Sequence, residues 1–343
     1  MGLGYAYAGK AHEDIRQELL GPMLDEAEED MDVLGFLALA LGLIFIGTGN
    51  DEIAGSILSI LQIKEGTTLT STHTRFLSLG LGLLYFGMFC SFALSLSLSH
   101  QPITELTPCL GVLSTGKQGD ADVTLQILST LTHEPTRQYG INTVETCAYA
   151  GTGNVLKIQK LLHACGAHLE TDNEFQGVAV IGIALIAMAE EIGAEMSLRT
   201  FDHLLQYGEP VIRRAVPLAL GLLSVSNPRL TVMDTLSKLS HDSDADVAQG
   251  AILGLGLIGA GTNNSRIAQL LRQLSAYYSK EANQLFIVRI AQGLLHLGKG
   301  TLTLNPYHAH NLLLSHTAVA GLLIVLHAAL DLKNRTSQRD LPE

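Results

Sequence analysis

The chain of 343 residues carries 21 Lys and Arg against 33 Asp and Glu, a formal net charge of -12. Nucleic-acid binders draw their affinity from clustered Lys and Arg, so this balance argues against a nucleic-acid-binding protein. Apolar residues make up 47% of the chain, aromatic residues only 5%, and tryptophan is absent, which favours many small, closely packed helices over one bulky core. The four cysteines, at positions 90, 109, 147 and 165, show no paired spacing, which favours a reducing compartment.

In chain order, the sequence repeats one pattern, an apolar stretch closed by glycine or another small residue and often followed by a polar turn. The clearest copies are LGLIFIGTGN (41–50), GLGLLYFG (80–87), GLIGAGTNN (256–264) and QGLLHLGKG (292–300). With four weaker copies, the closing positions are 9, 47, 87, 151, 189, 226, 261 and 298, and they lie 35 to 40 residues apart except for one step of 64. A period near 37 suits two helices and two short turns, so we predict about eight helical hairpins.

The two helices of each predicted hairpin differ in character. The first is apolar nearly all round and rich in Gly and Ala, as expected for a helix packed closely on several sides. The second begins after a potential capping residue, such as Asn50, Asn154 or Asn264, and places apolar residues at i, i+3, i+4 and i+7 on one face. Such a hairpin cannot bury its apolar surface alone, so we predict an all-α solenoid of stacked repeats.

One block interrupts the period. Residues 88–115, MFCSFALSLSLSHQPITELTPCLGVLST, account for the long step, because their removal leaves a step of 36. We therefore predict repeats over 1–87 and 116–333, an atypical insertion at 88–115 and a divergent tail at 334–343. The stretch from Phe76 to Ser99 has no charged residue and is long enough to cross a bilayer, but its first half carries the repeat pattern, so a repeat helix is favoured over a membrane span.

Short motifs that resemble ligand sites each lack a necessary part. Gly254–Gly259 matches G-x-G-x-x-G but lies within a helical repeat, not after a strand. Gly293–Lys299 and Gly111–Lys117 resemble phosphate loops without the hydroxyl that binds magnesium. The acidic residues at 242, 244 and 246 begin like a calcium loop without its glycine and its bidentate glutamate, so a turn that caps the next helix is predicted.

Three further groups of polar residues are better explained as surface. These are His163, Cys165 and His168, which have no second pair at zinc-site spacing; Glu190, Glu191 and Glu195, which have no predicted cleft; and the acidic run 25–32. The acidic run is predicted to be a solvated loop, with a docking patch for a basic partner as the alternative. We therefore predict no catalytic residue, no metal site and no cofactor.

Two long segments carry a resemblance to a known family. They are QGVAVIGIALIAMAEEIGAEMSLRTFDHLLQYGEPVIRRAVPLALGLLSVSNPRLTVMDTLSKLSHD (176–242) and GAGTNNSRIAQLLRQLSAYYSKEANQLFIVRIAQGLLHLGKGTLTLNPYH (259–308). Over residues 2–87 and 116–333 the chain resembles the proteasome/cyclosome repeat proteins, the large non-ATPase subunits in the base of the proteasome regulatory particle. The resemblance implies an α-solenoid curved into a closed or incomplete toroid.

The resemblance also implies a function. It indicates a scaffold, not an enzyme, that docks on the proteasome ATPase ring and contacts other regulatory-particle subunits in the cytoplasm and nucleus. It further implies sites for ubiquitin, for ubiquitin-like domains of shuttle receptors and for a deubiquitinase, with no nucleic-acid or membrane partner. A helical-repeat adaptor of another multiprotein complex is the alternative.

The resemblance places one receptor site on the helix that follows Gly47-Thr-Gly-Asn50. The predicted partner-binding residues are Asp51, Glu52, Ile53, Ser59, Ile60 and Ile63. Glu52 keeps the acidic first position of the family pattern, but the next matching positions are the uncharged Ser59 and Ile63, so attraction to the basic rim of ubiquitin should be weaker than the pattern implies. An apolar contact through Ile53, Ile60 or neighbouring residues is expected to remain. The alternative is that Asp51 and Glu52 only complement the helix dipole.

Overall fold

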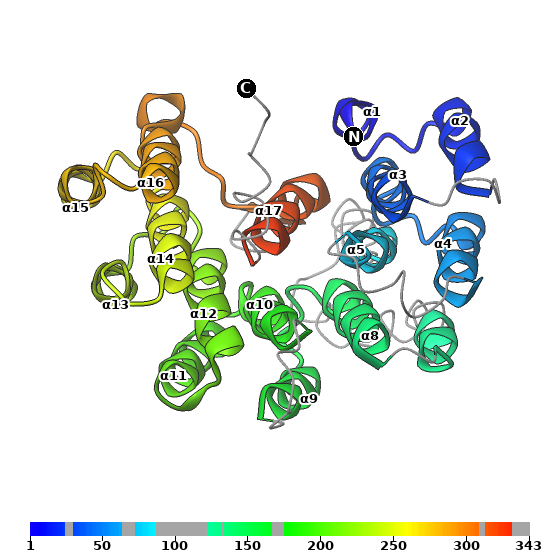
Figure 1. Cartoon of the computed structure of the whole chain (residues 1–343), viewed down its shortest axis with the longest axis horizontal. Helices are drawn as coiled ribbons and strands as arrows, with labels where there is room; N and C mark the ends of the chain where they lie inside the picture. The colour runs from blue at the N-terminus through cyan, green and yellow to red at the C-terminus, as the bar shows by residue number, and fades with distance from the viewer. Residues whose placement is uncertain are drawn as a thin grey trace, which may run out of the picture. The chain divides into compact units, whose positions relative to one another are not determined.

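The computed structural model describes residues 1–24, 30–63, 73–86, 122–131, 134–166, 175–308 and 313–330. They form two compact units, one of Met1–Ala150 with Tyr307–Ala320 and one of Gly151–Pro306 with Gly321–Glu343. The described residues are largely helical, which confirms the all-α prediction (Figure 1). The strands β1 (Tyr307–His308) and β2 (Leu313–Leu314) form one short antiparallel pair.

The first unit consists of two rows of helices. Its inner row is α1 (Gly2–Ala6), α3 (Met31–Ile44), α5 (Arg75–Leu84) and α8 (Glu134–Ala148), in which each helix packs against the next. Its outer row contains α2 (Glu13–Leu24), which packs on α3, and α4 (Asp51–Ile63), which packs on α5 (Figure 1). Residues 122–129 form a further helix, and the first five residues of α17 (His316–Ala329) complete the unit.

The second unit repeats this arrangement. Its inner row is α10 (Phe175–Ala187), α12 (Pro210–Leu223), α14 (Ala245–Ile258) and α16 (Ala282–Leu295). Its outer row is α9 (Val155–Gly166), α11 (Glu191–Tyr207), α13 (Leu230–Leu239) and α15 (Ser265–Tyr277). Each outer helix packs on the inner helix that follows it, and a 3-10 turn, η3 (Leu297–Gly300), ends the series. Two stacked rows of helical hairpins are the architecture of an α-solenoid.

The burial of each row follows from its sequence. Every residue of the inner helix α10 is buried, as its apolar composition on all sides predicts. The outer helix α15 instead buries only Ile267, Leu271 and Leu274, which are spaced by four and three residues and so lie on one face. The predicted capping is also confirmed, because the side chain of Asn264 accepts hydrogen bonds from the backbone N–H groups of Arg266 at 2.9 Å and Ile267.

Glycines allow the inner helices to approach closely. A Cβ atom on Gly42 would lie 2.9 Å from the Cα of Gly80 on the next inner helix, and a Cβ on Gly221 would lie 2.9 Å from the Cα of Gly254. Gly254 belongs to the G-x-G-x-x-G match, which therefore serves helix packing within the repeat. A substituted residue at these contacts would force adjacent helices apart.

The closing glycines lock consecutive repeats together. Gly47 has a φ of 70°, and its N–H donates to the carbonyl of Leu83 at 3.1 Å, while the N–H of Gly49 donates to Leu84 at 2.9 Å. Both acceptors lie at the end of α5, where helix carbonyls have no partner within their own helix. The same bond from closing residue to next inner helix joins Gly9 to Leu43, Gly151 to Leu185, Ser226 to Leu257 and Gly261 to Leu294. The repeated sequence pattern therefore encodes a connection between repeats.

Several predictions fall outside the described residues. They concern the insertion at 88–115, the tail at 334–343, the Gly111–Lys117 motif, most of the acidic run and the closing position 87. Among the helices that the structure does describe, none combines the length and the apolar composition needed to span a bilayer.

Candidate partner-binding surfaces

The N-terminal end of α4 carries the acidic part of the predicted receptor site. Asp51 and Glu52 are its first two residues and are exposed, and Asn50 caps the helix by accepting from the N–H of Glu52 at 3.0 Å. The carboxylate of Glu52 lies 3.0 Å from the guanidinium of Arg16 on α2, and Arg16 also pairs with Glu13 at 2.9 Å. A basic partner at α4 would therefore compete with Arg16 for Glu52.

The other predicted residues of α4 divide between core and surface. Ile63 is 78% exposed, whereas Ile53 is 0% and Ile60 8% exposed. An apolar contact through Ile53 or Ile60 is contradicted by their burial, because the helical period puts both on the face that packs into the unit, and Ile63 is the neighbouring apolar residue that stays accessible. Ser59 is half-buried, and its hydroxyl donates to the carbonyl of Ser56 at 2.8 Å. Of the six predicted residues, Asp51, Glu52 and Ile63 are therefore exposed, and Ser59 is partly accessible.

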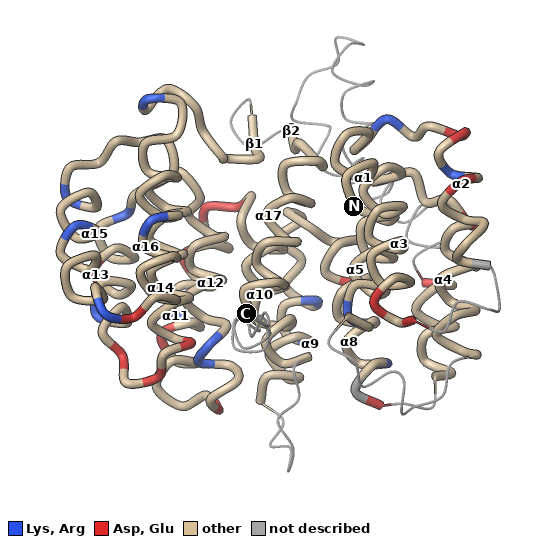
Figure 2. The backbone as a smooth tube through the Cα atoms, turned by 45° about the horizontal axis from the view of Figure 1, so that its top comes forward, with Lys and Arg blue, Asp and Glu red and all other residues tan. Residues whose placement is uncertain are grey.

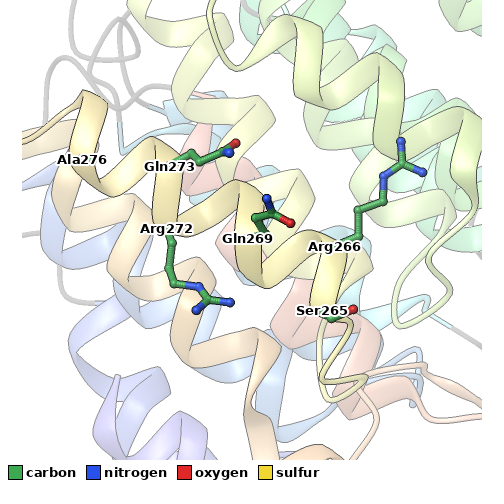
Figure 3. Close-up of a pocket in the computed structure, with 6 residues that line it drawn as sticks. All are labelled: Ser265, Arg266, Gln269, Arg272, Gln273 and Ala276. Carbon is green, nitrogen blue, oxygen red and sulfur yellow. The ribbon is translucent and has the colours of Figure 1, made fainter.

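A shallow depression that the sequence did not indicate lies along α15. It has a volume of about 710 Å³ and is lined by Ser265, Arg266, Gln269, Arg272, Gln273 and Ala276, all from the outward side of this one helix (Figure 3). Arg266 lies 2.8 Å from the carboxylate of Asp234 on α13, and Arg272 donates to the carbonyl of Ala268 at 3.2 Å. The lining contains arginines and amides without a carboxylate, histidine or thiol, so it provides a polar, basic surface and no acid–base pair.

The acidic triplet between α13 and α14 is a capping turn. Asp244 caps α14 by accepting from the N–H of Asp246 at 3.1 Å. The guanidinium of Arg214 lies 3.0 Å from Asp244 and 3.4 Å from Asp246, and Arg213 lies 3.7 Å from Asp242. These pairs fasten the turn to α12, as expected for a structural turn.

The two described cysteines are buried and are not poised for chemistry. Burial raises the pKa of both Cys147 and Cys165 to about 12, so each thiol stays protonated at neutral pH. Because the thiolate is the nucleophile and the metal ligand, neither role suits them. His163 is exposed on α9 and His168 lies outside the described residues; among the residues with described positions, no group of three His, Cys, Asp or Glu could hold a metal ion.

Stacked hairpins with glycine-locked turns define the chain as an α-solenoid repeat protein, and a family comparison identifies the type of repeat. The proteasome/cyclosome repeat model matches residues 250–284, which comprise the end of α14, all of α15 and the start of α16. The described copies before this segment share the same two-row packing, and the same turn bond recurs at closing positions 9, 47, 151 and 226. The match therefore covers one unit of a pattern that extends along the chain.

Similar proteins point to one particular subunit. The chain is 52% identical over 333 residues to the 26S proteasome non-ATPase regulatory subunit 2 of Dictyostelium discoideum. This alignment covers 97% of this chain and 33% of that protein. It is 50% identical to the 26S proteasome non-ATPase regulatory subunit 2 homolog A of Arabidopsis thaliana, over 92% of this chain and 32% of that protein. It is 48% identical to the 26S proteasome regulatory subunit rpn1 of Schizosaccharomyces pombe, over 95% of this chain and 34% of that protein.

These comparisons confirm the resemblance inferred from the sequence. Along nearly its whole length the chain is similar to 26S proteasome non-ATPase regulatory subunit 2. It spans about one third of the length of the relatives it matches.

Proposed function

We propose that this chain is a non-catalytic scaffold in the base of the 26S proteasome regulatory particle. The observation that carries the proposal is its similarity to regulatory subunit 2 proteins, at about half identical residues over more than nine tenths of the chain. The fold supports the same role, because an α-solenoid offers extended helical surfaces on which several partners can dock. The proposed setting is ubiquitin-dependent protein degradation in the cytoplasm and nucleus.

The proposed partners are of two kinds. The first comprises the proteasome ATPase subunits and other regulatory-particle subunits, which would hold the chain in the particle. The second comprises ubiquitin, the ubiquitin-like domains of shuttle receptors and a deubiquitinase, for which the chain would present binding sites. The polar outer faces of helices such as α4 and α15 support such roles, because they leave charged and amide groups exposed.

Affinity purification tests the scaffold proposal. The tagged chain is expressed in cells and the proteins that copurify are identified by mass spectrometry, with an unrelated tagged helical-repeat protein as the control. We expect proteasome ATPase subunits with the chain and not with the control. Recovery of another complex without proteasome subunits would instead support the alternative of an adaptor in a different assembly.

We further propose that the exposed end of α4 contributes to a site for ubiquitin-like domains. Titration of a fluorescent ubiquitin-like domain with the chain and with Glu52→Arg tests this, because exposed ion pairs contribute ~0.2 to 1 kcal/mol each and the reversal should weaken binding several-fold at low salt. Arg16→Ala is the matched control, since it also breaks the pair with Glu52 but leaves the carboxylate free. Equal affinities of the wild type and Glu52→Arg at low salt would exclude α4 from the site.

A further inference from the structure

The outward face of α11 carries a line of large exposed side chains. Ile192 is 76%, Met196 60% and Tyr207 73% exposed, and Arg199 and His203 lie between them on the same line. The spacing of four, three, four and four residues keeps all five on one face of the helix. The opposite face carries the buried residues Ala194, Ser197 and Phe201. This line of three large apolar side chains, one arginine and one histidine therefore faces solvent directly.

An acidic row runs along one side of this line. Glu191, Glu195 and Asp202 are exposed, and at 100° per residue all three fall on the same side of the Ile192–Tyr207 line. None of the three forms an ion pair with another described residue. The outward face of α11 thus combines three large apolar side chains, Arg199 and His203 with a flanking row of three carboxylates that form no ion pair with a described residue. Figure 2 marks the acidic positions of this helix in red.

The other outer helices of this unit expose large apolar side chains only at one end: Val155 and Leu156 begin α9, Leu230 begins α13 and Tyr277 ends α15. Arg266 is the second residue of α15, and Ile192 is the second residue of α11. The outward side of α15 is lined mainly by arginine and glutamine. Both helices fold as outer members of the same kind of hairpin. In α11, by contrast, Ile192, Met196 and Tyr207 extend from the first to the last turn on one face, and this alignment is typical of a seam that receives another helix.

We propose that the outward face of α11 is a docking surface for a basic amphipathic helix of a partner protein. The apolar side chains supply the contact, and methionine and tyrosine are favoured at such contacts because one is flexible and the other offers a large ring with a polar end. His203 and Tyr207 extend this contact as a ring pair with centroids 4.8 Å apart. The acidic row selects a helix with Lys or Arg along one flank and repels an acidic helix.

A binding experiment with a synthetic helix tests the proposal. The probe is a fluorescein-labelled peptide of about 18 residues, long enough to follow α11, with leucines on one face and lysines along one flank. Anisotropy titrations use the full chain, Met196→Asp, and the double variant Glu195→Lys/Asp202→Lys. The matched control is Leu230→Asp on α13, because the side chain of Leu230 is 61% exposed and that of Met196 is 60% exposed. We expect each α11 variant to weaken binding about tenfold or more, and Leu230→Asp to leave it within about twofold.

A second peptide with glutamates in place of the lysines separates charge selection from general adhesion. Its binding should be at least about tenfold weaker at low salt, in line with repulsion by the acidic row. Equal binding of the two peptides, or unchanged binding by folded Met196→Asp, would overturn the proposal. Self-association of the chain that Met196→Asp abolishes, with no peptide binding, would assign the face to a second copy and also overturn it. The surface is defined by α11 alone, so these outcomes do not affect the copurification test of the proteasome role.

Discussion

Substitution of Gly47 tests whether the closing glycine locks one repeat to the next. Gly47 has a φ of 70°, and a Cβ atom at this position would lie 2.5 Å from the backbone carbonyl oxygen of Phe86. Gly47→Ala therefore forces either a change of the turn or a displacement of the end of the next inner helix. Either movement should lengthen the bond from Gly47 to Leu83 and the companion bond from Gly49 to Leu84.

The expected loss of stability has two contributions. A left-handed backbone conformation costs alanine roughly 1–2 kcal/mol, and each weakened backbone hydrogen bond costs about 0.5–1.5 kcal/mol. Together, with two hydrogen bonds weakened, they predict that Gly47→Ala lowers the free energy of unfolding of the first unit by about 2–5 kcal/mol. Gly55 provides the matched control, because it lies within α4 and a Cβ there meets nothing within 4 Å. Gly55→Ala should stabilise the chain by about 0.5–1 kcal/mol through helix propensity.

The assay compares urea unfolding and hydrogen exchange of the two variants. Because the chain forms two compact units, exchange of the amides of residues 47 and 49 reports the local effect more directly than one global midpoint. We expect faster exchange at both amides in Gly47→Ala and no increase in Gly55→Ala. If both variants unfold at the same urea concentration and protect these amides equally, the proposed role of the turn is wrong.

Three further predictions concern a helix cap, the buried thiols and a buried histidine. Asn264→Ala should lower the free energy of unfolding by about 1 kcal/mol, because the N–H of Arg266 loses its acceptor at 2.9 Å, and an unchanged urea midpoint would contradict this. Cys147 and Cys165, whose pKa values burial raises to about 12, should resist iodoacetamide at pH 8 in the native state and react in urea; native labelling of either peptide would refute their burial. Burial lowers the pKa of His316 below 6.5, so this imidazole binds a proton more readily in the unfolded chain than in the folded chain. Stability should therefore fall as the pH drops below about 6.5, and His316→Gln should show a smaller difference in urea midpoint between pH 7.5 and pH 5.5.

Local patterns predicted the helices and the turns well. The alternation of all-apolar and one-sided helices, the closing glycines and caps such as Asn264 are properties of neighbouring residues, which the sequence displays directly. The candidate site on α4 was less well predicted. Ile53, Ile57 and Ile60 follow the spacing of a buried face, and the structure buries all three. Helical periodicity therefore predicted the accessibility of these residues to a partner better than the family pattern did.

The sequence by itself determined the repeat, its period and the helical class, because a helical period and a turn signal are written within a few residues. Only the tertiary structure decided which residues meet across repeats, such as Gly42 with Gly80 and Gly47 with Leu83, since those contacts depend on how successive hairpins stack. It also decided the exposed face of α11. That helix has apolar residues on both sides, and its packing on α10 and α12 determines that Phe201 is buried while Met196 faces solvent.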